Sequence, residues 1–204
     1  MSVRRFLDLI LPPTAEDRLI RDETSASIKR LYIPHYPKTH EAVASYREPV
    51  IKALITANKF QANRHASHLL ATLLAVRLLH FMQTVAVIPI PTAPERVRTR
   101  GHDHMQTILS YLPPALPTAY RPTILPGLKR IRHTVQQTTL QKDDRIRNLQ
   151  GAFLATRAVA TIPSEQPVVI IDDVVTTGAT LSEAKRALQN HLPAHTIHTL
   201  AVAH

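Results

Sequence analysis

The fold is decided by one stretch, Val168-Val169-Ile170-Ile171-Asp172-Asp173-Val174-Val175-Thr176-Thr177-Gly178-Ala179-Thr180-Leu181. Its first four residues are apolar and β-branched, which predicts a strand buried in the middle of a sheet. Asp172 and Asp173 follow at once and are expected outside the core, at the carboxyl edge of the strand, where open α/β sheets bind ligands. A helix is predicted from Ala179 to Leu192.

The residues after the two acids are suited to holding a phosphate. Hydroxyls, a glycine that allows close backbone approach and the free N–H groups of a helix start come together in Thr176, Thr177, Gly178, Ala179 and Thr180. A ligand with hydroxyls at one end and a phosphate at the other, such as ribose 5-phosphate, suits this order. A P-loop is excluded because the chain has no G-x-x-x-x-G-K-[ST] segment. The structural alternative is that the acids cap the helix and Thr-Thr-Gly makes a turn.

The rest of the chain predicts an α/β fold with a mostly parallel central sheet flanked by helices. Helical spacing of apolar residues indicates two helices between Tyr46 and Phe81, joined near residues 58 to 64. Further strands are predicted at Val85 to Ile90, near Ile124, at Ala152 to Ala155 and at Ile197 to Val202. The segment with Arg96, Arg98 and Arg100 is predicted to be a loop, Gly101 to lead into a helix through Leu112, and Lys129 to Gln141 to be a mobile loop.

Residues 1–45 are rich in turn residues and are expected to form an N-terminal extension, packed on a domain of residues 46–204. The apolar run Phe6 to Leu11 is interrupted by Asp8, and Leu69 to Ile90 contains Arg77 and Pro89, so no membrane insertion is expected. The chain has no cysteine, which excludes disulfides, cysteine-bound zinc and thiol catalysis. A cytoplasmic location is the resulting expectation.

The positive charge of the chain is concentrated in one segment. Ten Lys and Arg stand against three Asp between Arg96 and Arg147, so +7 of the net charge of +10 lies there. Such a segment suits a pyrophosphate or a nucleic-acid backbone, although an ordinary solvated basic surface has the same composition.

No metal site is expected from the 12 histidines: His102 and His104 would point to different sides of a helix, and His65 and His68 have no third ligand nearby.

The segment Val168 to Thr180 closely resembles the phosphoribosyl pyrophosphate (PRPP) motif of type I phosphoribosyltransferases. From about Tyr46 onward, the chain resembles the ComF family of competence proteins within that superfamily. The residues that carry this resemblance are Lys59, Pro89, Pro91, Arg100-Gly101, Leu128, Arg130, Arg132, Thr134, Gln137, Leu140, Arg145, Asn148 and Gly151-Ala152-Phe153.

Two features depart from the family pattern. Members usually begin with a four-cysteine zinc module, whereas the stretch after Leu11-Pro12-Pro13 has no cysteine, so zinc binding does not carry over. The family tends to read Arg-Gly-Phe-Asn-Gln where this chain reads Arg100-Gly101-His102-Asp103-His104.

The resemblance implies a PRPP site assisted by Mg²⁺. Asp172 and Asp173 would hold the ribose hydroxyls and lie beside the charge that develops in catalysis, with Mg²⁺ carried by PRPP and touching the same two acids. Thr176 to Thr180 would bind the 5-phosphate. The residues expected to meet the pyrophosphate are Pro91, Thr92, Arg100, Lys129, Arg130 and Arg132.

Three functions stay open. The resemblance favours a ComF-like PRPP-binding protein of DNA uptake, with single-stranded DNA and the competence machinery as partners. The first alternative is a phosphoribosyltransferase of nucleotide salvage that acts on a nitrogen acceptor, and the second is a regulator that senses PRPP. The segments expected to form an acceptor site offer only Tyr32, Tyr36, Tyr111 and Tyr120 for base stacking, which disfavours a dedicated salvage enzyme.

Overall fold

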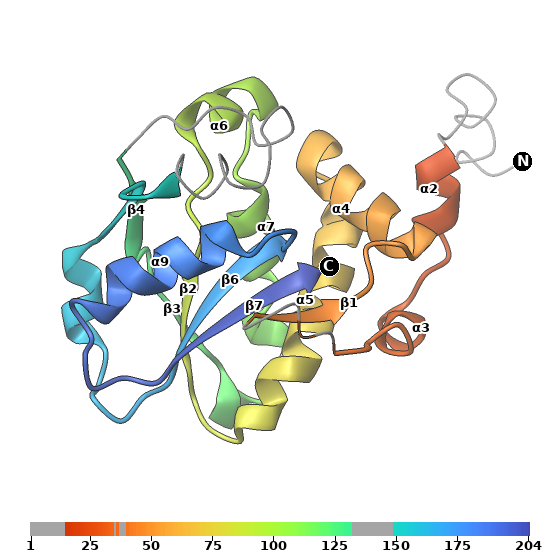
Figure 1. The fold of residues 1–204 in the computed structure, drawn as a ribbon. Helices are drawn as coiled ribbons and strands as arrows, with labels where there is room; N and C mark the ends of the chain where they lie inside the picture. Colours follow the sequence, from red (N-terminus) through yellow and green to blue (C-terminus); the bar gives the residue numbers. More distant parts are fainter. Residues whose placement is uncertain (1–14, 35, 37–39, 132–148) are drawn as a thin grey trace, which may run out of the picture.

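A computed structural model describes residues 15–34, 36, 40–131 and 149–204 of the chain. Within these residues the main sheet has five strands, all parallel, in the order β1-β7-β6-β2-β3 (Figure 1). The strands are β1 (Glu41–Ala44), β2 (Ala86–Pro89), β3 (Thr123–Ile124), β6 (Val168–Val174) and β7 (Ile197–Ala203). The predicted α/β fold is therefore confirmed, with β6 as the central strand.

Helices cover both faces of this sheet (Figure 1). One face packs against α4 (Pro49–Gln61), α5 (Arg64–Leu78) and α7 (His104–Ser110), and the other against α9 (Ala179–Gln189). The shorter elements are α2 (Ala15–Ile20), α3 (Ser25–Lys29), α6 (Pro94–Arg100) and the 3₁₀ turns Leu79–Phe81, Pro113–Ala115, Thr118–Tyr120 and Arg157–Thr161. No helix in the described part of the chain is both long and apolar enough to cross a membrane.

Strand alternation along β6 sets the directions of the two acids. Val169 and Ile171 belong to the core on the α4 and α5 face, whereas Val168 and Ile170 belong to the core on the α9 face. Because successive side chains of a strand point to opposite faces, Asp173 continues the first face and Asp172 the second. The two acidic side chains therefore lie on opposite faces of the sheet at its carboxyl edge.

The N-terminal segment contributes directly to the sheet. β1 pairs with β7, with Glu41 opposite Leu200, and the side chains of Ile20 and Ile28 are buried in the core. The division of the chain at residue 45 stays a prediction, but residues 41–44 form an edge strand of the same sheet as the PRPP-like motif.

One loop prediction was wrong, and a second was wrong at its first two residues. The segment with Arg96, Arg98 and Arg100 is the helix α6, which begins at Pro94 and ends where Gly101 adopts a left-handed conformation at φ 77°. It has no buried residue, so the apolar periodicity that identifies a helix is missing.

The start of the second predicted loop is a strand, β4 (Leu128–Arg130), which pairs antiparallel with β5 (Phe153–Ala155). Its charged residues hide the strand pattern, and Leu128 is its only buried residue. Residues 132–141 of that predicted loop lie outside the described residues.

Candidate functional site

Asp172 and Asp173 lie near the end of β6, just before the loop that leads to α9. Asp172 lies opposite Ala201 of β7 and is partly exposed, whereas Asp173 is only 7% exposed. The backbone N–H of Asp173 donates to Oδ1 of Asp172 at 2.9 Å. The expectation that both acids lie outside the core therefore describes Asp172 only.

Asp173 is held by two cationic or proton-donating side chains from the helices on its face. Lys59 Nζ, from the last turn of α4, lies 2.6 Å from Asp173 Oδ2, and His104 Nε2, from the first residue of α7, lies 2.8 Å from the same oxygen. Two donors on one oxygen fix the orientation of this carboxylate.

The environments of the two acids shift their pKa values in opposite directions. Burial raises the pKa of Asp172 to about 7, and the neighbouring charge of Asp173 adds to the shift. Burial alone would also raise the pKa of Asp173, but the hydrogen bond from His104 and the charge of Lys59 outweigh it and hold that pKa below its usual range. The site thus pairs a carboxylate whose pKa is lowered with one whose pKa is raised to about 7.

The predicted phosphate loop lies beside this pair and leads into α9. Gly178 adopts φ 78° and forms the N-cap of the helix, and the N–H of Ala179 donates to the Thr177 hydroxyl at 3.4 Å. Thr176 is exposed, and Thr177 and Thr180 are partly exposed. An open loop at a helix N-terminus can present N–H groups and hydroxyls to an anion.

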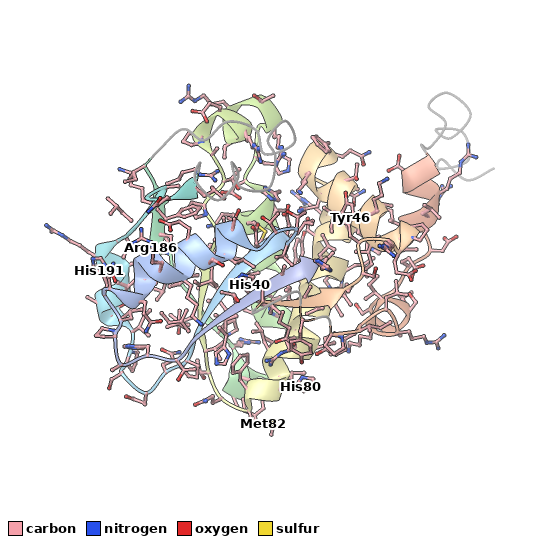
Figure 2. All side chains as sticks on the ribbon, in the orientation of Figure 1. His40, Tyr46, His80, Met82, Arg186 and His191 are labelled. Atoms are coloured by element: carbon pink, nitrogen blue, oxygen red, sulfur yellow. The ribbon has the colours of Figure 1, made fainter. Side chains whose placement is uncertain are left out.

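His40 supports this loop from inside the protein. A Cβ atom on Gly178 would lie 2.6 Å from His40 Nε2, well inside contact distance. The two ring nitrogens of His40 bond the hydroxyls of Ser182 at 3.0 Å and Thr199 at 2.8 Å, which tie the ring to α9 and β7. His40 is buried, and its label in Figure 2 lies below α9 and over the sheet. Only glycine fits at position 178 against this ring.

Two of the residues predicted to bind pyrophosphate reach the acid pair through His104. Thr92 Oγ1 donates to Asp103 Oδ1 at 3.0 Å and lies 3.3 Å from His104 Nδ1. Arg100 Nη1 lies 3.4 Å from the same nitrogen. Pro91 comes directly after Ile90, whose N–H donates to the carbonyl of Ile171 next to the acids.

Arg130 lies close enough to Asp172 for the carboxylate charge to affect the pKa of its guanidinium. Lys129, the preceding residue of β4, points to the other side of that strand. The guanidinium of Arg130 lies over the Phe153 ring at 5.3 Å, and its Nε has no hydrogen-bond partner within the described residues. Burial lowers the pKa of Arg130, Arg96 lowers it further, and the charge of Asp172 opposes them. Lys129 is exposed. Arg132 lies outside the described residues.

Sequence reasoning missed part of this site. From the sequence, Lys59 stands out only through the family resemblance, and His104 only as a histidine whose spacing does not suit a metal site and as part of the segment that departs from the family pattern. No sequence pattern points to His40 or Phe60. Phe60 follows Lys59 at the end of α4, is 65% exposed and carries the Arg100 guanidinium 5.1 Å from its ring centre. By contrast, Tyr111 packs edge-on against His68 and Tyr32 stacks on His80.

Comparison with known proteins agrees with the geometry. Residues 128–204, which include β6, the predicted phosphate loop and α9, match the family model of the phosphoribosyl transferase domain. The chain is 31% identical over 153 residues to Competence protein F of Haemophilus influenzae, a match that covers 72% of this chain. It spans 65% of the length of that relative.

Proposed function

We propose that this chain, a ComF-like member of the type I phosphoribosyltransferase family by its matched domain and its similarity to Competence protein F, binds PRPP with Mg²⁺ at the carboxyl edge of β6 and acts in DNA uptake. The observation that carries the proposal is the convergence of three parts. Asp172 and Asp173 end the central strand, the Gly178 loop opens α9 beside them, and His104 joins Asp173 to Thr92.

Each part suits one portion of PRPP. The partly exposed Asp172 can accept hydrogen bonds from ribose hydroxyls, and the ionised Asp173 places negative charge near the ribose. The Thr176 to Thr180 loop offers hydroxyls and helix N–H groups to the 5-phosphate. Thr92 and the guanidinium groups of Arg100 and Arg130 would meet the pyrophosphate, because charge-assisted donors match its oxygens.

The residues present fit magnesium only as an ion shared with the ligand. The described residues include no group of three or more His, Asp or Glu that could enclose a metal. Mg²⁺ prefers oxygen ligands and often keeps several waters while it binds substrate phosphates. Asp172 and Asp173 would supply protein oxygens, and the bound ion would neutralise charge on the pyrophosphate.

The proposed DNA role rests on the basic surface next to this site together with the name of the relative. Arg96 and Arg98 are exposed on α6, and Lys129 is exposed on β4. Exposed cations at the mouth of a pyrophosphate site can also track the phosphates of single-stranded DNA. PRPP and DNA would then compete, since Arg100 and Arg130 lie between the two.

A transferase reaction is the second candidate, favoured by Phe60. Its exposed ring and the Arg100 guanidinium that covers part of it form a flat surface, and Arg100 also reaches His104. An acceptor base stacked there would be held near the ribose. If the acceptor nitrogen attacked the ribose C1, the bond from C1 to the pyrophosphate oxygen would break and pyrophosphate would leave with the electron pair.

Two titrations test the proposal. Calorimetry with PRPP and Mg²⁺ should give saturable binding to the wild-type protein, and absence of binding at millimolar PRPP would remove the core of the proposal. Fluorescence anisotropy of a labelled oligonucleotide should give an affinity that falls by roughly 0.7 log units per tenfold salt for each phosphate neutralised. Millimolar PRPP should displace the oligonucleotide, and no oligonucleotide binding at low salt would leave the transferase and the PRPP sensor as the remaining functions.

A further inference from the structure

We propose that His104 is a positioning residue that orients Asp173 for the ligand and couples it to Thr92. This inference rests on the proposed function, because it assigns how two parts of the PRPP site act together. The imidazole lies between them: Nε2 is 2.8 Å from Asp173 Oδ2, and Nδ1 is 3.3 Å from Thr92 Oγ1.

The short contact of Nε2 with the Asp173 carboxylate favours a proton on Nε2. A carboxylate oxygen only accepts, so the short contact to Asp173 requires Nε2 to donate. Nδ1 faces the Thr92 hydroxyl and the Arg100 guanidinium at longer distances of 3.3 and 3.4 Å. Whatever stands on Nδ1, a proton on Nε2 therefore keeps the contact with Asp173 attractive.

The backbone of His104 is fixed independently of its ring. Asn58 Nδ2 donates to the carbonyl oxygen of His104 at 3.2 Å, and Ser67 Oγ donates to Asn58 Oδ1 at 2.8 Å. Asn58 and Ser67 are fully buried, and Asp103 caps the helix that His104 begins. A side chain held from a buried scaffold can orient its partner with little freedom.

His104 has a task that Lys59 cannot perform alone. Both donors contact Asp173 Oδ2, but Lys59 ends a flexible four-carbon stem and is the more exposed of the two. The imidazole is rigid, is only 7% exposed and alone reaches Thr92 among the described contacts of Asp173. Loss of the ring would leave the buried carboxylate in contact with the flexible Lys59 side chain, which defines its orientation less well.

The test compares His104→Leu with His104→Gln. Leucine keeps much of the volume without a donor, and glutamine restores an N–H that can reach the carboxylate. PRPP affinity in the presence of Mg²⁺ should fall on the order of 10- to 100-fold in His104→Leu, by analogy with the loss found when a partner that orients a metal ligand is removed. Most of the affinity should return in His104→Gln. His191→Leu, at the far end of α9 in Figure 2, is the control for loss of a histidine as such.

A double-mutant cycle with Thr92→Val separates coupling from simple loss of structure. If His104 links Asp173 to Thr92, the two substitutions should be non-additive in PRPP affinity, whereas additive effects would overturn the coupling. Melting temperatures measured without ligand identify a variant that merely fails to fold. If His104→Leu does not fold, the PRPP affinity of His104→Gln compared with that of the wild type decides. Wild-type affinity in His104→Leu would overturn the inference and leave the proposed function intact, but a wild-type protein that does not bind PRPP would overturn both.

Discussion

The ring of His40 occupies the space that any side chain on residue 178 would need. The loop that is proposed to hold the 5-phosphate therefore owes its shape to a residue that comes before the first strand of the sheet. This packing gives the glycine of the motif a structural role in addition to close approach to a phosphate.

Replacement of Gly178 should accordingly disturb both the fold and the site. Gly178→Ala places a methyl group against His40 at a left-handed backbone position, which should cost about 1–3 kcal/mol of stability. Gly178→Val should also weaken ribose 5-phosphate binding several-fold or more. The double variant Gly178→Ala/His40→Ala should lose less stability than the sum of the single changes, measured by chemical unfolding. Additive losses would mean that the ring can move aside.

The two acids should respond differently to neutralisation. Asp172→Asn should weaken PRPP binding and, at about pH 5, leave the melting temperature close to that of the wild type, because Asp172 is partly exposed and carries its proton at that pH. Asp173→Asn should weaken PRPP binding and also lower stability by about 1.5–3 kcal/mol, because it removes the buried charge that Lys59 and His104 contact. Calorimetric titration and thermal unfolding of both variants measure the difference. Equal effects on stability would contradict the unequal burial of the pair.

The raised pKa of Asp172 predicts a pH dependence of stability. Between about pH 4 and pH 7 the folded protein keeps a proton on Asp172 that the unfolded chain has released, so stability contributed by this group falls as pH rises through that window. Asp172→Asn removes the effect, and the variant should gain stability relative to the wild type on going from about pH 5 to pH 8. Parallel stability curves for the two proteins would show that the carboxyl has its ordinary pKa.

The exposed ring of Phe60 predicts a stacking contribution. Phe60→Ala should weaken binding of a single-stranded oligonucleotide or an acceptor base by an amount equivalent to about 1–3 kcal/mol, with the salt dependence unchanged. Phe60→Trp should restore the affinity. Met82→Ala is a matched control, because Met82 is 70% exposed and lies at the opposite end of the molecule from the site (Figure 2). Equal losses in the Phe60→Ala and Met82→Ala variants would exclude stacking.

Local patterns were sufficient for the central strand, the acid pair and the phosphate loop. These features follow one another along the chain, so periodicity and residue type identify them without tertiary information. The residues that hold these features in place could not be predicted in the same way. His40 bonds Thr199 across 159 positions, and Lys59 and His104 approach Asp173 from two helices whose packing no local pattern encodes.

Charged residues also concealed regular structure. α6 has no apolar face and β4 has one buried residue, so both were predicted to be loops. Each is held by its context: a proline start and a glycine end for α6, and antiparallel pairing with β5 for β4. Prediction from hydrophobic patterning fails for elements of this kind because little of their surface is buried.

The pairing of β1 with β7 also affects how the chain folds. β1 is synthesised before every other strand of the sheet, and its neighbour β7 after all of them. The ladder from Glu41 to Leu200 therefore cannot close on the ribosome until nearly the whole domain has emerged, and β1 meanwhile offers an unpaired edge to other chains. Closure over so long a loop also favours slow folding. During synthesis, β1 and the neighbouring His40 thus reach their native positions only if β1 does not pair with another chain before β7 has emerged.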